Sequence, residues 1–278
     1  MLVEKHGIAP QVFRHLRIEN KASFSLFLFS MKKILFLLLA CGPLLLSAQK
    51  TAGKVKYIAE HSWTKKIKYM NYLTPQQIEK MTYAWGHDDV WKEVSELYFS
   101  PSESRYLDSK EQVENYDWTS KAETYTITRN FDKQTIRDHV HIGEKKYVVE
   151  DTLIAQKWKI MSEIKEIAGH ICLKAVTKDT IKNQTIVAWF AQDIPVPAGP
   201  ERFCGLPGLI LELDYNFGAL VITASNIEFM QPKPEELSLP AKLKGKVIKD
   251  KDYVALIKDF ILTRVKMENY PFWGIRYN

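Results

Sequence analysis

Segments in which apolar and polar residues alternate recur along this chain, and short polar turns separate them. The side chains of a strand point alternately to the two faces of a sheet, so a period of two predicts strands rather than helices. Regular short strands joined by polar turns indicate a mainly β fold built on an antiparallel sheet. The predicted strands are 54–63, 97–99, a short one around 106, 125–129, 136–142, 146–150, 158–164, 171–176, 185–191, 209–215 and 220–229.

Two segments carry the signals of helices instead. Thr74 is a suitable N-cap, Pro75 fits the first helical position, and Gln77 completes a capping box. Residues 250–266 repeat apolar residues at helical spacing with charges on the opposite face, which predicts an amphipathic C-terminal helix that covers the sheet. The apolar residues of that helix are Val254, Ile257, Ile261 and Val265.

Residues 31–48 have the three parts of a secretory signal peptide. Lys32 and Lys33 form a basic start, an apolar core follows, and Ala48 is a small residue at the expected cleavage site. The apolar core is shorter than the roughly 20 residues of a membrane-spanning helix. We therefore expect export to the periplasm or the outer membrane, with no transmembrane span in the mature chain.

This signal divides the chain into three parts. Residues 1–30 are expected to be an overcalled extension, residues 31–48 the signal peptide, and residues 49–278 a single β-rich domain. Two alternatives stay open: an uncleaved signal anchor, and a lipoprotein in which Cys41, at the end of a sequence that resembles a lipobox, carries the lipid.

Export also determines how the cysteines are interpreted. After cleavage only Cys172 and Cys204 remain, and an oxidising compartment permits a disulfide between them. The sequence predicts that bridge, with two buried free thiols as the alternative. Neither cysteine has a second metal ligand at the spacing of a zinc knuckle, so a zinc site at the cysteines is not expected.

Charge and motifs exclude several classes of protein. The chain carries a net charge of +6, but much of the excess lies in residues 1–48, and a nearly neutral remainder argues against nucleic-acid binding. The sequence contains no G-x-S-x-G, H-E-x-x-H, P-loop or G-x-G-x-x-G motif. No cofactor is expected. Catalytic carboxylate pairs leave no sequence signature, so a hydrolase stays open.

A stiff segment rich in proline and glycine lies between the predicted strands that end at 191 and begin at 209. Proline restricts φ, and glycine permits backbone geometries that are closed to other residues. The pattern predicts strand, rigid loop and strand, with the loop as either a structural clasp across the sheet or the preformed rim of a binding site. The residues that we assign to binding in and around this segment are Trp158, Trp189, Pro195, Gly199, Pro200, Gly205, Leu206, Pro207 and Gly208.

The sequence Gly205-Leu206-Pro207-Gly208-Leu209-Ile210 resembles the hexapeptide after which the GLPGLI family of exported Bacteroidota proteins is named. Residues 167–175 and 188–200 resemble the segments that precede it in that family. The resemblance implies a curved antiparallel sheet or half-barrel, similar to lipoprotein-carrier domains, with one or two covering helices. It also implies an outer-membrane TonB-dependent receptor as a partner, and related modules occur as the N-terminal part of larger secreted glycan-processing enzymes.

Histidines and aromatic residues supply the remaining candidate sites. His139 and His141 share one face of a strand and could hold a metal ion if a third ligand approached, or could form a solvated strand face. The run His87-Asp88-Asp89 could hold a cation or act as an acid–base pair, or form a polar loop. Aromatic side chains could line an apolar cavity or bind sugars, or belong to the core.

These observations favour a non-enzymatic exported module that binds a lipid-like or peptide-like ligand or docks a partner. The alternatives are a hydrolase of envelope or extracellular polymers and a metal-handling protein. A hydrolase requires two or three ionisable side chains that converge in the folded chain.

Overall fold

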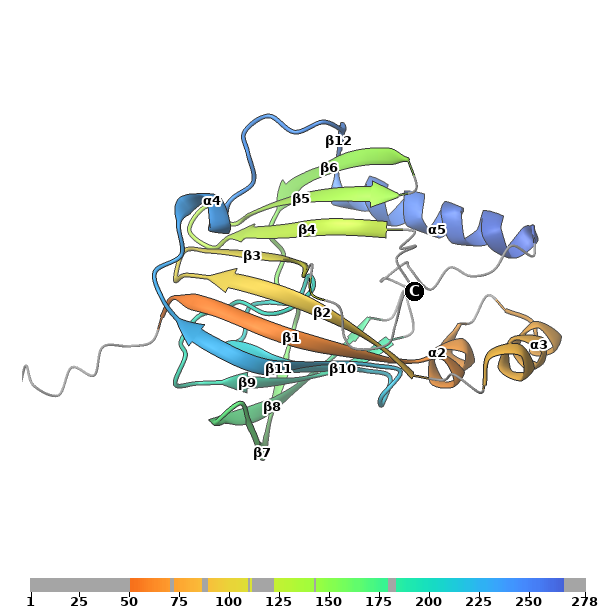
Figure 1. Ribbon diagram of the computed structural model, residues 1–278, viewed down its shortest axis with the longest axis horizontal. Helices are drawn as coiled ribbons and strands as arrows, with labels where there is room; N and C mark the ends of the chain where they lie inside the picture. The colour runs from red at the N-terminus through yellow and green to blue at the C-terminus, as the bar shows by residue number, and fades with distance from the viewer. Residues whose placement is uncertain are drawn as a thin grey trace, which may run out of the picture. The chain divides into compact units, whose positions relative to one another are not determined.

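The computed structural model describes residues 51–70, 73–86, 90–109, 111, 123–142, 144–179 and 184–267. These residues form one large, curved and unclosed sheet of 12 strands with a few helices, so the predicted fold class is confirmed (Figure 1). The strands are β1 (Gly53–Ser62), β2 (Val90–Phe99), β3 (Glu103–Asp108), β4 (Glu123–Asn130), β5 (Thr135–Ile142), β6 (Lys145–Thr152), β7 (Lys159–Ile167), β8 (His170–Asp179), β9 (Gln184–Ala191), β10 (Leu209–Tyr215), β11 (Leu220–Phe229) and β12 (Lys246–Ile248).

Strand β1 joins two meanders of the sheet. The strand order is β12-β6-β5-β4-β3-β2-β1-β11-β10-β9-β8-β7, so the chain runs outward from β1 to β6, crosses to β7 at the opposite edge and returns to β11 beside β1. All neighbouring strands are antiparallel except β12, which pairs with β6 in parallel. This topology gives the sheet two separated arms that curve around a shared interior.

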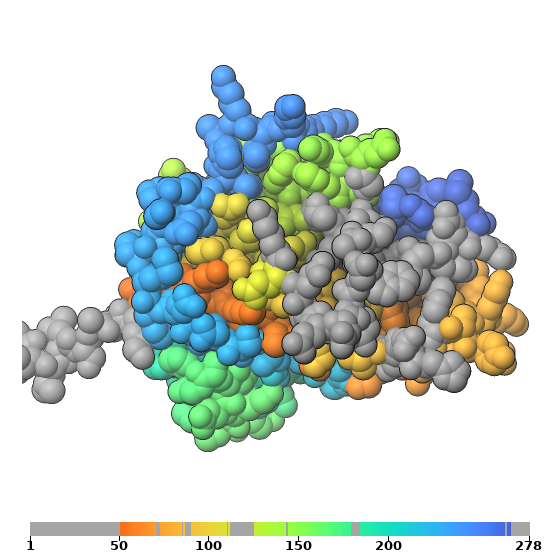
Figure 2. All heavy atoms as spheres, viewed as in Figure 1, coloured from red at the N-terminus to blue at the C-terminus, as the bar shows by residue number. Residues whose placement is uncertain are grey.

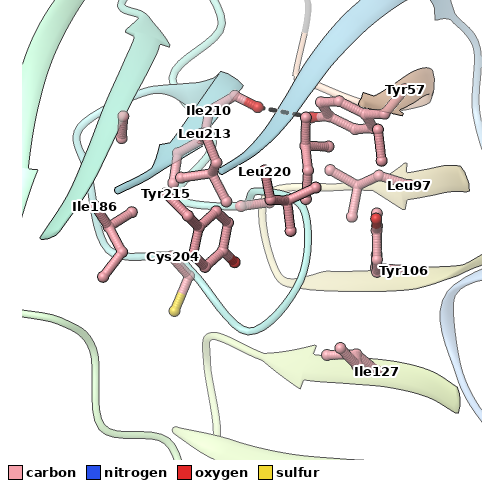
Figure 3. Close-up of a cluster of buried hydrophobic side chains, with 14 of the residues drawn as sticks. Tyr57, Leu97, Tyr106, Ile127, Ile186, Cys204, Ile210, Leu213, Tyr215 and Leu220 are labelled. Carbon is pink, nitrogen blue, oxygen red and sulfur yellow. Dashed lines mark hydrogen bonds between the residues drawn. The ribbon is translucent and has the colours of Figure 1, made fainter. Parts of the chain in front are cut away.

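The core lies on the concave face of the sheet. Burial alternates along β1, where Val55, Tyr57 and Ala59 are buried. The Tyr57 hydroxyl donates a hydrogen bond of 2.6 Å to the backbone oxygen of Ile210, which links β1 to β10 through the interior (Figure 3). Side chains from both arms therefore meet in one apolar cluster.

The helices cover parts of the sheet and its ends. They are α2 (Trp63–Tyr69), α3 (Pro75–Trp85), α4 (Pro234–Leu237) and α5 (Asp250–Lys266). The predicted capping box of α3 is confirmed: Thr74 Oγ1 accepts from the Gln77 N–H, and Gln77 Oε1 accepts from the Thr74 N–H. The predicted C-terminal helix is also confirmed.

The apolar face of α5 packs against the core, as its spacing predicts. Tyr253, Ile257 and Ile261 are buried and belong to the apolar cluster, while the Val265 side chain lies outside the described residues. Within the described ranges, no helix is both long enough and apolar enough to cross a bilayer.

The predicted disulfide is wrong, because Cys172 and Cys204 are both buried free thiols. Cys172 lies on β8, and its thiol interacts electrostatically with Asp193, Glu212 and Lys165. Cys204 lies in the loop before β10, where the nearby charge is that of Arg129. The two thiols thus have different charged neighbours in the interior, and burial shields both of them from solvent.

Several predicted features lie outside the described residues. These are the extension over 1–30, the signal peptide over 31–48 with Cys41, and the run His87-Asp88-Asp89. They stay predictions from the sequence.

Candidate functional site

The loop over residues 192–208 crosses the concave face between β9 and β10 and organises the polar part of the interior. Its backbone is tied to the sheet by hydrogen bonds from Leu209 N to Ile194 O (2.9 Å) and from Ile210 N to Ala198 O (3.0 Å). The Trp158 indole N–H donates to the backbone oxygen of Cys204 (2.9 Å). The predicted order of strand, loop and strand is confirmed.

Two glycines allow the loop to approach the sheet closely. A Cβ atom at Gly208 would lie 2.2 Å from the backbone oxygen of Ala191, which cannot move away as a flexible side chain could. A Cβ atom at Gly199 would lie 2.7 Å from the Ile210 side chain and 2.8 Å from the backbone oxygen of Phe203. These contacts explain why glycine is required at both positions.

The loop carries Glu201 into the interior, where its carboxylate meets two tyrosines. The Tyr125 hydroxyl donates to Glu201 Oε2 at 2.5 Å, and the Tyr106 hydroxyl lies 3.4 Å from Glu201 Oε1. Tyr106 also donates to Ser95 Oγ at 2.7 Å. Glu201 is only 4% exposed and has a φ of 57°, in the left-handed region that costs most residues free energy. These contacts hold the strained residue in place.

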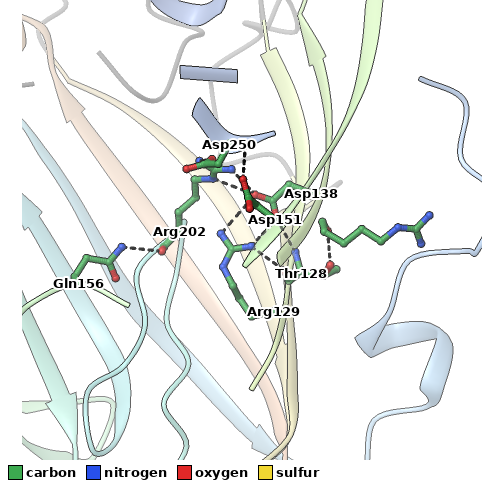
Figure 4. Close-up of polar contacts among 8 residues, drawn as sticks. Thr128, Arg129, Asp138, Asp151, Gln156, Arg202 and Asp250 are labelled. Atoms are coloured by element: carbon green, nitrogen blue, oxygen red, sulfur yellow. Dashed lines mark hydrogen bonds and ion pairs between the residues drawn. The ribbon is translucent and has the colours of Figure 1, made fainter. Parts of the chain in front are cut away.

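The next residue of the loop, Arg202, enters a buried charge cluster with β4 and β5. Asp138 on β5 is fully buried and accepts from Arg129 Nη1 at 2.5 Å and from Arg202 Nη2 at 2.8 Å. Arg202 also pairs with Asp250 at the start of α5, through Nη1 at 2.5 Å (Figure 4). One arginine thus connects the loop, the sheet and the C-terminal helix.

The electrostatics of Asp138 follow from two opposing effects. Burial alone would raise the pKa of its carboxyl group, because it disfavours the charged form. The guanidinium groups of Arg129 and Arg202 outweigh burial and hold the pKa of Asp138 below its usual value. Asp138 is therefore an ionised group that two cations neutralise.

We expect the stabilisation that Asp138 provides to depend on pH. Its pKa is lower in the folded chain, so this contribution is complete above the ordinary aspartate pKa of about 3.9 and is lost as the pH falls through the lowered value. The difference in unfolding free energy between the wild type and Asp138→Asn should be constant from about pH 7 to about pH 5 and should shrink below about pH 4. Urea unfolding over a pH series measures it. An undiminished difference at the acidic end would contradict the expectation.

The ionisable groups of this polar cluster are held by partners rather than left free to react. Asp138 is neutralised by two arginines, and Glu201 accepts from the Tyr125 hydroxyl and lies 3.4 Å from that of Tyr106. Burial raises the pKa of the Cys172 thiol to about 12 and raises that of Cys204, so neither thiol is an activated nucleophile. The cluster is suited to holding the loop, the sheet and α5 in one geometry.

The predicted binding residues separate into two groups in the structure. Trp158 packs beside Phe203 at the loop, with ring centroids 6.0 Å apart. The ring centroid of Trp189 lies 5.7 Å from the Lys165 Nζ atom on β7 and 6.0 Å from the Lys174 Nζ atom on β8. Within the loop, Pro195, Gly205 and Pro207 are exposed; Gly199, Pro200, Leu206 and Gly208 are buried. The buried group packs the interior, and binding by the exposed group stays a prediction.

The predicted metal pair lies at the other arm of the sheet. The rings of His139 and His141 pack edge to face, with their centroids 4.8 Å apart. The Nε2 atom of His139 lies 3.1 Å from the backbone oxygen of Lys244. The part of the chain that the structure describes brings together no group of three residues of metal-binding type. A third ligand is thus not among the described residues.

Sequence reasoning missed the residues that form the polar cluster. The sequence contains one available signal, because the charged pair Glu201-Arg202 directly follows the rigid Gly199-Pro200 step. The partners on β2 to β5 carry no signal, since they are distant in sequence and become neighbours only when the sheet curves. These partners are Ser95, Tyr106, Tyr125, Arg129 and Asp138.

The fold and the cluster define a class of β-rich domain, an open antiparallel sheet that curves around a rigid inserted loop. Residues 91–256 match the family model described as "N-glycanase peptide, N-terminal domain", and because this match spans more than half of the chain, the chain belongs to that family. No curated protein matches the chain.

Solved structures show the same fold. Two crystal structures of PNGF-II, in space groups P21 and C2, are each 16% identical to this chain and have TM-scores of 0.50 and 0.51. In both comparisons the match covers 75% of this chain and 33% of the PNGF-II chain. This chain therefore corresponds to about a third of the length of those proteins.

These comparisons correct two expectations. The assignment to the GLPGLI family is wrong, because the family match and the PNGF-II structures point to the N-glycanase N-terminal domain instead. The hexapeptide at 205–210 is a short match in a tight loop, where packing against Ala155 and Ala191 by itself favours small residues. The expectation of a non-enzymatic module is also wrong, since the family favours the hydrolase alternative. A TonB-dependent receptor as partner and a periplasmic or outer-membrane location stay predictions.

Proposed function

We propose that this chain functions in the hydrolysis of N-linked glycans, as the N-terminal domain of an N-glycanase. The observation that carries the proposal is the family match over residues 91–256. The PNGF-II structures support it through the shared fold.

The geometry indicates which part of the task the described residues perform. Asp138 and Glu201 are buried, and both are bonded to neighbouring side chains. A carboxylate that transfers protons to a substrate must come within hydrogen-bond distance of that substrate. We therefore assign bond cleavage to groups other than Asp138 and Glu201, and we assign to the described sheet the positioning of the glycoprotein on a rigid surface.

The test uses the purified chain and a peptide that carries one neutral N-linked glycan. Calorimetry compares binding of this glycopeptide with binding of the same peptide without its glycan. We expect the glycopeptide to bind at least about tenfold more tightly, which corresponds to about 1.4 kcal/mol. In parallel, an envelope extract is prepared from producing cells that no longer make the chain. Mass spectrometry follows glycan release by this extract before and after the purified chain is added.

We expect added chain to increase the rate of glycan release by that extract. Equal affinity for the two peptides, together with an unchanged rate of release, would overturn the proposed function. Asp138→Ala is unsuitable as a test variant because it is expected to destabilise the whole domain, so heat-denatured chain serves as the negative control.

A further inference from the structure

A basic pocket lies at the edge of the sheet opposite β7, between β6, β12 and α5. It has a volume of about 510 Å³, within the range of small-molecule sites. Lys145, Lys146 and Lys246 line it, together with Asp252 of α5. Tyr147, Ile248 and Leu256 supply its apolar walls. Figure 2 shows the blue segment that carries β12 at the molecular surface, against the yellow-green strands of this arm.

The lysines of this pocket are placed by an ordered segment. Strand β12 pairs in register with β6, with Lys246 opposite Tyr147 and Ile248 opposite Val149. Gly245, with a φ of 148°, approaches the backbone of Lys146 so closely that a Cβ atom would lie 3.1 Å from it. The preceding residues are held by hydrogen bonds from Arg137 to the backbone oxygens of Pro240 (2.7 Å) and Ala241 (2.8 Å).

Among the residues that the structure describes, most of the positive charge of this pocket is uncompensated. Across the residues that the structure describes, the ammonium groups of Lys145, Lys146 and Lys246 form no ion pair or hydrogen bond. Some lysines on other strands are paired, for example Lys54 with Glu96 (2.9 Å) and Lys165 with Glu212 (2.7 Å). Three cations facing one carboxylate produce a local positive field, which a concave wall of low polarity strengthens.

The field also reaches the neighbouring strand. Partial burial, His139 and the cation of Lys146 together hold the pKa of His141 below its usual value. His141 is therefore predominantly neutral near neutral pH, and the positive field belongs to the lysines.

We infer that this pocket binds an acidic sugar, a monosaccharide that carries a carboxylate, at the end of an N-linked glycan. The lysine ammonium groups suit the carboxylate, Asp252 can accept hydrogen bonds from sugar hydroxyls, and Tyr147, Ile248 and Leu256 can contact the apolar face of the ring. A flat anionic surface would not use the apolar walls, which favours a sugar over a membrane. The inference rests on the proposed function and names part of its substrate.

The experiment measures binding of sialyllactose and of lactose to the full chain by calorimetry. Sialyllactose should bind, and lactose, which lacks the carboxylate, should bind at least about tenfold more weakly. The variant Lys145→Gln/Lys246→Gln should lose at least about tenfold in affinity for sialyllactose, and added salt should weaken binding to the wild type. The matched control is Lys133→Gln/Lys157→Gln, which removes two exposed lysines outside the pocket and should bind as the wild type does.

Three outcomes would overturn the inference. They are equal or absent binding of the two sugars, unchanged affinity in the pocket variant while its circular dichroism is native, and lysine-dependent binding to phosphatidylserine vesicles without sialyllactose binding. Because the test of the proposed function uses a neutral glycan, the two proposals fail separately. A chain that binds the neutral glycopeptide but does not bind sialyllactose would overturn only the acidic-sugar inference.

Discussion

Replacing Asp138 with alanine is expected to lower the free energy of unfolding by about 3 to 5 kcal/mol, the usual cost of removing one partner of a buried ion pair. The substitution leaves the guanidinium group of Arg129 buried without its carboxylate, and Arg202 loses the partner that joins the loop to β5. Arg202 keeps Asp250, so the loss at that residue is partial. Urea unfolding followed by tryptophan fluorescence measures the change.

The control for this prediction is Asp132→Ala. Asp132 is an exposed aspartate in the turn between β4 and β5, so its removal should change stability by less than about 0.5 kcal/mol. If both variants were equally stable, the buried cluster would not hold the loop, and the assignment of Asp138 as its centre would be wrong.

The variant Gly208→Ala is expected to destabilise the chain by about 3 kcal/mol, at the upper end of the cost of overpacking. The added methyl group would lie 2.2 Å from the backbone oxygen of Ala191 and 3.1 Å from the Cα atom of Gln192. Both contacts are with backbone, so the strain cannot be relieved by a side-chain rotation. Either the loop or the end of β9 must move, and thermal unfolding of the variant measures the loss.

Gly169→Ala is the matched control, because it separates backbone strain from crowding. Gly169 has a φ of 80°, but a Cβ atom there would meet nothing within 4 Å. Its replacement should cost only the backbone penalty of about 1 to 2 kcal/mol. If Gly208→Ala destabilised the chain no more than Gly169→Ala, close packing of the loop would not be what requires glycine at position 208.

The two predictions address one structural idea, that the loop over 192–208 is held rigid from both sides. Gly208 controls how closely the loop lies on β9, and Asp138 controls the salt bridges that fix Arg202. If the chain positions a glycoprotein as proposed, loosening the loop should weaken glycopeptide binding.

The elements with strong local signals could be predicted from the sequence. The capping box at Thr74 and Gln77, the helix over 250–266 and the series of alternating strands were predicted close to their observed positions. The elements missed have weak local signals: α2 and α4 are short helices, and β12 is a strand of three residues. Such elements form because the chain around them holds them there, for example Arg137 beside the segment that precedes β12.

The candidate site was less predictable than the fold. Lys145 and Lys246 are 101 positions apart, and their shared pocket depends on a parallel pairing at the edge of the sheet that no local pattern announces. The predicted disulfide failed for a related reason. Two cysteines in an exported chain permit a bridge, but the geometry of the fold places Cys172 and Cys204 in separate surroundings.

The sequence by itself determined the class of fold, the rigid crossing before residue 209 and the amphipathic C-terminal helix, because these depend on side-chain period and on the backbone limits of proline and glycine. Only the tertiary structure decided which residues form the buried cluster and the basic pocket. The contact between Arg202 and Asp138 forms when the 12-stranded sheet curves around the loop, and the pocket forms when β12 pairs with β6 at the edge of the sheet. That curvature is a property of the whole sheet, which no short stretch of residues encodes.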